Sequence, residues 1–356
     1  MNDKLLPGQT IGLVGKNYYG QELKRALQQS GYRVQHEALH DLNETSFQKL
    51  IQQVDSLFYC TDHLPLEWLD DATSAKSLQD SSVLAMLQDR ILFKNFLDDL
   101  NVNTQPYAVI LAKEDIAEVI DSIGFPCVLK SNQDLSEQYF IYEDTDITEV
   151  YDQLPEGPAI LEAWIPLDTE LAVVFSRSER GAVHIISSVE VVRRSGRVAQ
   201  YITAPRMEAS WLAECEEVTR QFAEDLAGAG VYHLKLLISA AGVIYVHGLS
   251  AVPPLVHFPE DGYGDSLILS EQVRLLAKEP FVMQQADLSA QYVILPLQRQ
   301  QIERAFSVIM DHPQWRLKFT SRDWTEVAPT AKVADIIIRA DQLQEVLAEI
   351  SELDLY

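Results

Sequence analysis

A chain of 356 residues, of which 47% are hydrophobic, is long enough for two or three domains with cores of their own and is not a disordered protein. The 28 lysines and arginines are outnumbered by 53 aspartates and glutamates, and a net charge of −25 argues against binding to nucleic acid or to an anionic membrane. The first residues, MNDKLLPGQT, lack the apolar core of a signal peptide, and no apolar run approaches the roughly 18 residues of a membrane span. We therefore expect a cytoplasmic protein.

The patterns of the first 100 residues predict an α/β domain. Thr10–Val14 is a buried strand, and the turn GKNYYG, a helix and the strand GYRVQHE follow it as a right-handed βαβ unit. Only Gly15 and Gly20 flank the turn, whereas a dinucleotide site needs three glycines at fixed spacing. The missing glycine excludes a nicotinamide-dependent dehydrogenase. The N-terminus of the helix could still hold an anion of another ligand. A single helix from Asp80 to Leu100 closes the domain.

Strands and helices then alternate over residues 107–164, which predicts a small α+β lobe of the kind that closes over a ligand. From Thr169 the strands are longer, and turns at Ser178–Gly181 and at Ser195-Gly196 predict an antiparallel sheet. A helix from Ala209 to Gly228 and, from Tyr292, a final module of strands and helices complete the chain.

The three cysteines, Cys60, Cys127 and Cys215, lie far apart in or beside apolar runs. None has the CxxC spacing of a redox or zinc site. We expect them to be buried as small hydrophobic residues.

The stretch Val231–Phe258 predicts a β-hairpin with a two-residue turn at Ala241-Gly242, where glycine supplies the positive φ that such a turn needs. Counting back from this turn, Lys235 faces Gly248 across the hairpin. Facing residues of antiparallel strands project to the same side of the sheet, so these two residues share one face.

Three residue positions, in order, suggest a nucleotide cleft. Lys130 ends the buried strand of GFPCVLK and can meet phosphate oxygens as a point charge. Glu162, on a strand that links two lobes, can hold an adenine, and Glu170 can accept the hydroxyls of a ribose.

The chain resembles the ATP-grasp superfamily and, within it, the 5-(carboxyamino)imidazole ribonucleotide synthetases, purine-pathway ligases that use ATP and bicarbonate. Matching segments run through the chain: IGLVG, LQDRILFKNFL, GFPCVLK, ILEAWIPLDTELAVVFSR, SSVEVVRRSG, ITAPR and PTAKVADIII. The resemblance implies a mixed α/β and α+β fold with a Rossmann-like N-terminal domain over 1–100 and an ATP-grasp domain over 101–290. In that domain a lid over about 105–165 adjoins a central antiparallel sheet, and a C-terminal α/β module spans 291–356. ATP as cofactor, a small-molecule nucleotide ligand and a homodimer are also implied.

The resemblance assigns roles to residues that match the family's motifs. It implies ATP contacts for Arg90, Lys130, Glu162, Trp164, Ile165 and Glu170. On the side of the ribonucleotide and bicarbonate it implies Gly15, Gly20, Glu190, Arg194 and Lys332.

Departures from the family concern the metal and the phosphates. Lys235 and Gly248 occupy the positions of the two metal carboxylates, His247 that of an asparagine, and Val252 and Pro254 those of an arginine and a histidine. The glycine-rich phosphate loop is replaced by SNQDLSEQYF, which has no glycine and adds Asp134 and Glu137, and a Gly-His pair is replaced by Ala334-Asp335. Mg²⁺ binding is therefore doubtful, and no catalytic residue is assigned.

Two readings of the function remain. One is an ATP-dependent carboxylating ligase with a rebuilt metal site, and the other is a non-catalytic relative, a pseudoenzyme that binds a ligand or a protein. Phosphoryl transfer depends on Mg²⁺ to position and neutralise the phosphates, so the loss of both carboxylates favours lost or altered ligase activity.

Overall fold

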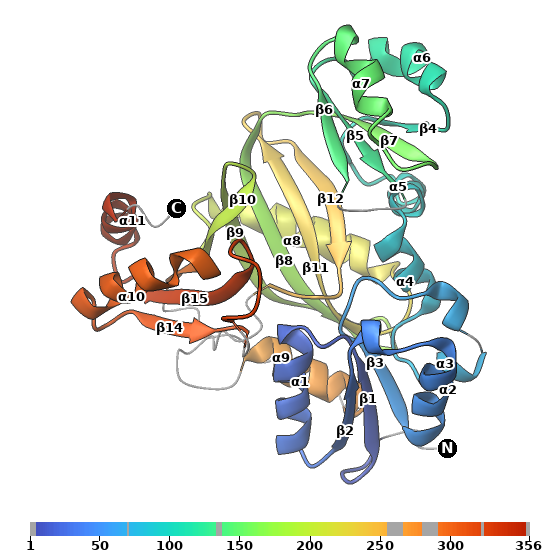
Figure 1. The fold of residues 1–356 in the computed structure, drawn as a ribbon, viewed down its shortest axis with the longest axis vertical. Helices are drawn as coiled ribbons and strands as arrows, with labels where there is room; N and C mark the ends of the chain where they lie inside the picture. Colours follow the sequence, from blue (N-terminus) through green and yellow to red (C-terminus); the bar gives the residue numbers. More distant parts are fainter. Residues whose placement is uncertain are drawn as a thin grey trace.

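Three β-sheets and the helices that cover them make up the part of the chain that the structure describes. This computed structural model describes residues 5–69, 71–132, 137–254, 266–279, 291–321 and 324–353. Figure 1 shows the N-terminal sheet in blue at the bottom, a small green sheet at the top, and a long sheet that runs between them toward the C-terminal helices. None of the helices within these ranges is long and apolar enough to cross a membrane.

The predicted βαβ unit is confirmed. β1 (Thr10–Val14) lies between β2 (Arg33–Glu37) and β3 (Ser56–Tyr59) and pairs in parallel with both. α1 (Tyr18–Gln29) connects β1 to β2, and α2 (Glu44–Gln53) connects β2 to β3. Four buried residues of β1 form the middle of this sheet, as its apolar sequence requires. Two short 3-10 turns and a one-turn helix complete the region: η1 (Leu39–Asp41), η2 (Leu66–Trp68) and α3 (Asp71–Ser74).

Glycine allows the turn between β1 and α1 to pack tightly. Gly15 has a φ of +110°, and a Cβ there would lie 2.8 Å from the carbonyl oxygen of Cys60. A Cβ on Gly20 would collide with the carbonyl oxygen of Gly15. The Gly20 amide donates a hydrogen bond of 2.8 Å to the side chain of Asn17, which caps α1. The turn therefore uses this amide within the chain rather than for an anion.

The prediction of a single helix over residues 80–100 is wrong. Two helices, α4 (Ser81–Gln88) and α5 (Arg90–Asp99), meet at Asp89, whose backbone is extended with φ −131° and ψ 110°. The Asp89 carboxylate accepts a 2.9 Å hydrogen bond from the Leu92 amide. Because an aspartate competes for backbone donors in this way, it ends one helix and starts the next in spite of continuous apolar periodicity.

The small α+β lobe is a four-stranded antiparallel sheet in the order β4-β7-β5-β6. Its strands are β4 (Tyr107–Ile110), β5 (Cys127–Ser131), β6 (Gln138–Ile141) and β7 (Ala159–Ala163). The helical segments beside them are α6 (Lys113–Ile123), η3 (Asp144–Asp146) and α7 (Ile147–Tyr151). One face packs Leu129 and Leu161 against these helices, and strand alternation places Lys130 and Glu162 on the other face. Asp134 lies outside the described residues.

The long sheet has eight strands in the order β12-β11-β8-β9-β10-β13-β15-β14. Its strands are β8 (Leu167–Arg177), β9 (Val183–Arg194), β10 (Arg197–Ile202), β11 (Gly230–Ser239), β12 (Ile244–Ser250), β13 (Tyr292–Gln298), β14 (Arg316–Phe319) and β15 (Lys332–Arg339). The helical segments beside it are α8 (Ala209–Glu224), α9 (Leu267–Leu276), η4 (Arg299–Gln301), α10 (Ile302–Asp311) and α11 (Leu343–Glu352). The sheet continues through the β10–β13 pair into the C-terminal part of the chain, and the division into domains stays a prediction.

The hairpin of β11 and β12 has the predicted pairing but not the predicted turn. Its loop has three residues, because the Ser239 amide donates to the Val243 carbonyl at 3.0 Å and Gly242, with φ +79°, closes the turn. This loop shifts the register by one residue, so Leu236 pairs with Val246. A β-bulge at His247 then shifts it back, and Lys235 faces Gly248.

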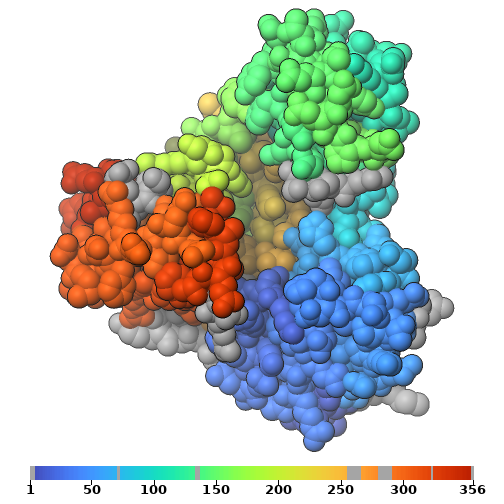
Figure 2. Space-filling view, in the orientation of Figure 1, coloured from blue at the N-terminus to red at the C-terminus, as the bar shows by residue number. Residues whose placement is uncertain are grey.

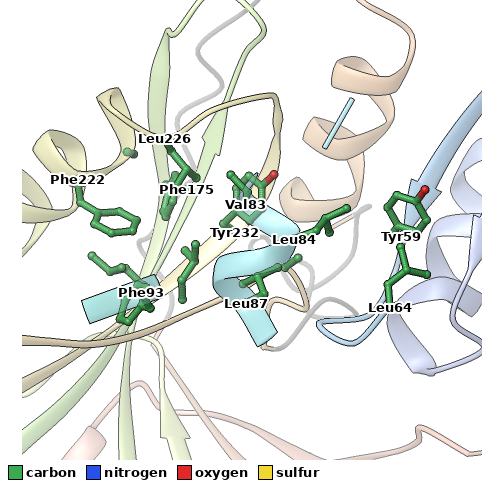
Figure 3. Packing of buried hydrophobic residues seen from close by; sticks show 14 of the residues in the cluster. Tyr59, Leu64, Val83, Leu84, Leu87, Phe93, Phe175, Phe222, Leu226 and Tyr232 are labelled. Atoms are coloured by element: carbon green, nitrogen blue, oxygen red, sulfur yellow. The ribbon is translucent and has the colours of Figure 1, made fainter. Parts of the chain in front are cut away.

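One apolar core joins the N-terminal part to the long sheet. Figure 3 shows side chains of α4 and α5 between the N-terminal strands and the long sheet with α8. Phe93 of α5 meets Phe222 of α8 edge-on, with ring centroids 6.2 Å apart. Burial of each such side chain contributes about 1.5–3 kcal/mol, so this core holds α5 firmly in place. The position of α5 decides where Arg90 and Lys94 lie.

The three cysteines are free and buried, as predicted. Burial raises the pKa of Cys127 to about 11 and that of Cys215 to about 12, and it also raises the pKa of Cys60. These thiols are therefore protonated at neutral pH and act as small core residues.

Candidate functional site

A cavity of about 260 Å³ lies where the lobe, α5 and the hairpin come together. Figure 2 shows the molecule hollowed between its blue, green and orange parts, with yellow and tan atoms at the back of the hollow. Segments far apart in sequence line the cavity: Asp62, His63, Met86, Leu87, Arg90, Phe93, Lys94, Glu162, Lys235, His247, Gly248 and Leu249.

A buried carboxylate between two lysines forms one wall of this cavity. Glu162 is 3% exposed, and its Oε1 atom lies 2.7 Å from Lys94 Nζ. Lys130 Nζ donates to the other carboxylate oxygen, Oε2. Burial by itself would raise the pKa of Glu162, but Lys130 and Lys94 hold it well below its usual range. Burial lowers the pKa of Lys130, and Glu162 opposes that effect. The carboxylate is therefore ionised and shared by two ammonium groups.

Lys94 is a site residue that the sequence reasoning missed. Its Nζ atom also donates to the hydroxyl of Thr104 at 2.6 Å and lies 5.1 Å from the ring centre of Tyr107. The signal was present, because Lys94 follows Arg90 by four residues and so lies on the same side of a helix.

Arg90 joins α5 to the lobe. Its Nε atom donates to the carbonyl oxygen of Ser131 at 3.0 Å, and the next amide, of Ile91, donates to the Asn132 side chain at 3.2 Å. Burial lowers the pKa of Arg90, and Glu162 opposes that effect. The guanidinium is thus held beside the cavity at the point where a phosphate loop would follow Lys130.

Lys235 brings a further amine to the cavity wall from the hairpin. A Cβ on Gly248 would lie 3.6 Å from Lys235 Cδ, so the lysine chain extends over the glycine. Burial lowers the pKa of Lys235, and the carboxylates of Asp62 and Glu170 oppose that effect. In the described part of the chain, no group of three or more His, Cys, Asp or Glu side chains is placed to hold a metal ion.

The other residues assigned to ATP lie outside the cavity lining. Trp164 is exposed and Ile165 is half-buried on the link between β7 and β8. Glu170 on β8 accepts two hydrogen bonds from Arg193, at 2.5 and 2.9 Å. The Arg193 guanidinium is therefore bound to the carboxylate that the resemblance assigns to a ribose.

The residues assigned to the second substrate are spread over the molecule. Gly15 and Gly20 form the turn of the βαβ unit, and Arg194 is exposed at the tip of the β9–β10 hairpin. Glu190 is buried and accepts from the Arg206 amide at 2.8 Å and from the guanidinium of that residue. Lys332 lies 2.9 Å from the carboxylate of Asp335. Burial raises the pKa of Asp335, and Lys332 opposes that effect. None of them is among the residues that line the cavity.

A buried histidine, His233, and a half-buried one, His247, accompany the amines. His247 Nδ1 lies 2.7 Å from the amide oxygen of Gln105, whose Nε2 donates to the Ala163 carbonyl at 3.2 Å, so His247 donates from Nδ1. Burial, with Lys130 as the next cause, lowers the pKa of His247 to about 3. Burial and Lys235 lower the pKa of His233 to about 3 as well. Both imidazoles are therefore neutral at physiological pH.

These histidines predict a loss of stability in mild acid. Between pH ~6.5 and ~3 the unfolded chain binds a proton at each histidine that the folded chain does not, so the free energy of unfolding falls as pH falls. From pH 7.5 to pH 5.5, His247 should lower the free energy of unfolding by about 1.4 kcal/mol. Urea unfolding at the two pH values should show that this loss is absent in His247→Asn. Equal slopes for wild type and His247→Asn would contradict the prediction.

Comparison with known proteins agrees with this architecture. The family model described as the ATP-grasp domain matches residues 95–254. The N5-carboxyaminoimidazole ribonucleotide synthase of Bacillus subtilis is 23% identical over 271 residues, which cover 70% of this chain and 71% of that protein.

Solved structures match over almost the whole chain. An N5-carboxyaminoimidazole ribonucleotide synthetase in complex with ADP has a TM-score of 0.88 and 19% identity, covering 100% of this chain and 98% of the other. The enzyme of Aspergillus clavatus, with ADP and 5-aminoimidazole ribonucleotide bound, has a TM-score of 0.86 and 16% identity, covering 98% of each chain. Residues 95–254 therefore match the ATP-grasp domain, and the chain has, along its whole length, the fold of the N5-carboxyaminoimidazole ribonucleotide synthetases.

Proposed function

We propose that this protein binds a nucleotide without Mg²⁺ and is not a metal-dependent ligase. The facing pair of Lys235 and Gly248 carries the proposal, because the resemblance places the two metal carboxylates at these positions. A glycine offers no ligand, and an ammonium repels a divalent cation.

The charges around the cavity suit a phosphate chain that arrives without its metal ion. Two carboxylates, Glu162 and Asp62, and four cationic side chains lie in or beside the cavity, the cations being Arg90, Lys94, Lys130 and Lys235. They leave an excess of positive charge in a site of low dielectric constant, where each charge acts strongly on an anion. Fixed ammonium groups can hold phosphates in this way, but they cannot bridge two phosphates during transfer as Mg²⁺ does. Binding is thus supported more strongly than catalysis.

The second candidate is an active carboxylating ligase of purine biosynthesis. The match to the synthetases over the whole chain favours it, as does the retention of Arg90, Lys130 and Glu162 in one site. Such an enzyme would use ATP, bicarbonate and aminoimidazole ribonucleotide, and it would need another source for both metal ligands. A homodimer and a cytoplasmic location are proposed with either candidate.

Calorimetry decides between the two candidates. ATP and ADP should bind equally well or better in EDTA than in Mg²⁺, and aminoimidazole ribonucleotide with bicarbonate should not stimulate ADP release. Lys235→Met should weaken nucleotide binding about tenfold, since a charge-assisted contact to phosphate is worth about 1.5–3 kcal/mol. Lys49→Met, at an exposed lysine of α2 outside the cavity, is the matched control and should bind as wild type does. Binding that requires Mg²⁺, together with substrate-stimulated ADP release, would establish the ligase instead.

A further inference from the structure

Two lysines of the cavity wall share a single carboxylate. Lys94 Nζ lies 2.7 Å from Glu162 Oε1, and Lys130 Nζ donates to the other oxygen of the same group. All three side chains are almost inaccessible to water, so dissolved ions screen their charges little. Because one carboxylate cannot neutralise two ammonium groups, this wall keeps one positive charge.

The other charged side chains that line the cavity are two cations and one carboxylate: Arg90, Lys235 and Asp62. The Asp62 carboxylate acts on Lys235 more strongly than any other charged group does. It is held in place, because it accepts hydrogen bonds from the Ser250 hydroxyl at 2.5 Å and from the Ala251 amide at 2.7 Å. One carboxylate against two cations leaves a second positive charge.

The remaining charged and titratable neighbours add no net charge. Glu170 and Arg193 form an ion pair with each other, and neither of them lines the cavity. Burial lowers the pKa of both His233 and His247 to about 3, so these imidazoles are neutral. His63 is exposed, and an imidazole in water carries no charge at pH 8. At that pH four cations and two carboxylates therefore leave the cavity with an excess of two positive charges.

The rest of the side chains that line the cavity are apolar. Leu87, Phe93 and Leu249 are buried, and Met86 is half-buried. Aromatic rings and a thioether sulfur both pack favourably against a flat ring such as a purine. The cavity, of about 260 Å³, is small beside the roughly 300–1,000 Å³ of most small-ligand sites. It therefore suits a short ligand that has a charged end and a ring.

We propose that the ligand of this cavity is a nucleoside monophosphate, bound as its dianion, rather than a nucleoside diphosphate or triphosphate. The inference rests on the proposed function, since it names the class of nucleotide that the site binds without Mg²⁺. A phosphate monoester carries a charge of about −2 above pH ~7, which matches the excess charge of the cavity. Each further phosphoryl group adds negative charge that the described cations do not neutralise, and uncompensated charge is strongly destabilising at low dielectric constant.

The segment that follows Lys130 also disfavours a longer phosphate chain. The Ser131 carbonyl oxygen accepts from Arg90 Nε at 3.0 Å, and the Ser131 amide donates to the Glu137 carbonyl at 3.1 Å. Glu137 thus lies beside the residue that holds Arg90, in the segment that the resemblance assigns to the loop over the phosphates. Its carboxylate would repel a second or third phosphate there. The residues assigned to the ribonucleotide substrate lie outside this cavity, so the monophosphate would bind on the side assigned to ATP.

Calorimetry at pH 8 in EDTA tests the proposal on the full chain, with adenosine 5′-monophosphate, ADP and ATP as probes. We expect the monophosphate to bind about tenfold more tightly than ATP, with ADP between them. Adenosine lacks the charge and ribose 5-phosphate lacks the ring, so each should bind at least about tenfold more weakly than the monophosphate.

Asp62→Asn changes the charge of the cavity without changing the size of the side chain. The excess rises to three positive charges, because one of the two carboxylates is removed. The ratio of the Kd values for the monophosphate and ADP should therefore shift about tenfold in favour of ADP. This ratio is the readout, since a weakened fold lowers both affinities together. Asp121→Asn, at an exposed position of α6, is the matched control and should keep the wild-type ratio.

The outcomes separate this inference from the proposed function. Wild-type protein that binds ATP, or ribose 5-phosphate, as tightly as the monophosphate in EDTA overturns the inference and leaves nucleotide binding without Mg²⁺ standing. An unchanged ratio of Kd values in a folded Asp62→Asn variant overturns it as well, because charge balance would then not select the ligand. Protein that binds none of the three nucleotides in EDTA contradicts the proposed function itself, and the inference with it.

Discussion

Replacing Glu162 by glutamine should lower the free energy of unfolding by about 3–5 kcal/mol, the range found when one partner of a buried ion pair is removed. Glutamine keeps the shape of the side chain, so the packing around it is unchanged. It leaves the ammonium groups of Lys94 and Lys130 buried without their counter-ion, and both are almost inaccessible to water. Urea unfolding at pH 7 measures the loss.

Glu170→Gln is the matched control for this change. Glu170 also accepts from a cation, but its partner Arg193 has a side chain that is 46% exposed, so water screens the pair. An exposed pair of this kind is worth about 1 kcal/mol or less. If Glu162→Gln and Glu170→Gln lower the free energy of unfolding by the same amount, Glu162 is not the counter-ion on which the site depends.

The pH dependence of the Glu162 contribution has a definite sign. Its folded pKa lies below that of the unfolded chain, so its contribution is fully present above pH ~4.3 and is lost as the pH falls through the folded pKa. The loss caused by Glu162→Gln should therefore be constant from pH 8 to pH 5 and shrink only in stronger acid.

Changing Lys235 and Gly248 together to glutamate should make nucleotide binding depend on Mg²⁺, with at least a tenfold tighter Kd in Mg²⁺ than in EDTA. The two residues face each other on one side of the sheet, so the new carboxylates would stand together as hard oxygen ligands. Gly248 tolerates a side chain, because it is not among the glycines of positive φ and its Cβ would meet Lys235 Cδ at an ordinary 3.6 Å.

A double variant of the same size without the charges is the control for this experiment. Lys235→Gln with Gly248→Gln removes the ammonium and fills the same space, yet amide oxygens alone should not give the Mg²⁺ dependence. If the glutamate pair binds nucleotide no differently in Mg²⁺ and EDTA, these positions are not where a metal ion would be held, and the argument for lost catalysis fails.

The pairing of Lys235 with Gly248 was predicted correctly from a wrong turn. Counting from a two-residue loop gives the right partner only because the third loop residue is offset by the bulge at His247. Neither feature follows from apolar alternation, since a bulge depends on how the strand meets its neighbours. The break at Asp89 was missed for a similar reason, because an aspartate at a helix start looks the same in sequence as an aspartate on a helix surface.

By itself the sequence determined the elements that local periodicity encodes, namely the βαβ start, the antiparallel strands and the hairpin, and through its motifs the ATP-grasp domain that the family model matches over residues 95–254. The roles of Arg90, Lys130 and Glu162 as ATP contacts stay predictions. Only the tertiary structure decided which charges meet. Lys94 of α5 and Lys235 of β11 line one cavity, and Lys130 of β5 is bound to Glu162 in its wall, because two sheets and a shared core bring these segments together. Distance then decides what each lysine does, since two of them share the Glu162 carboxylate, whereas Lys235 forms no ion pair with any described residue. Such differences arise from desolvation and distance, which no local pattern of residues contains.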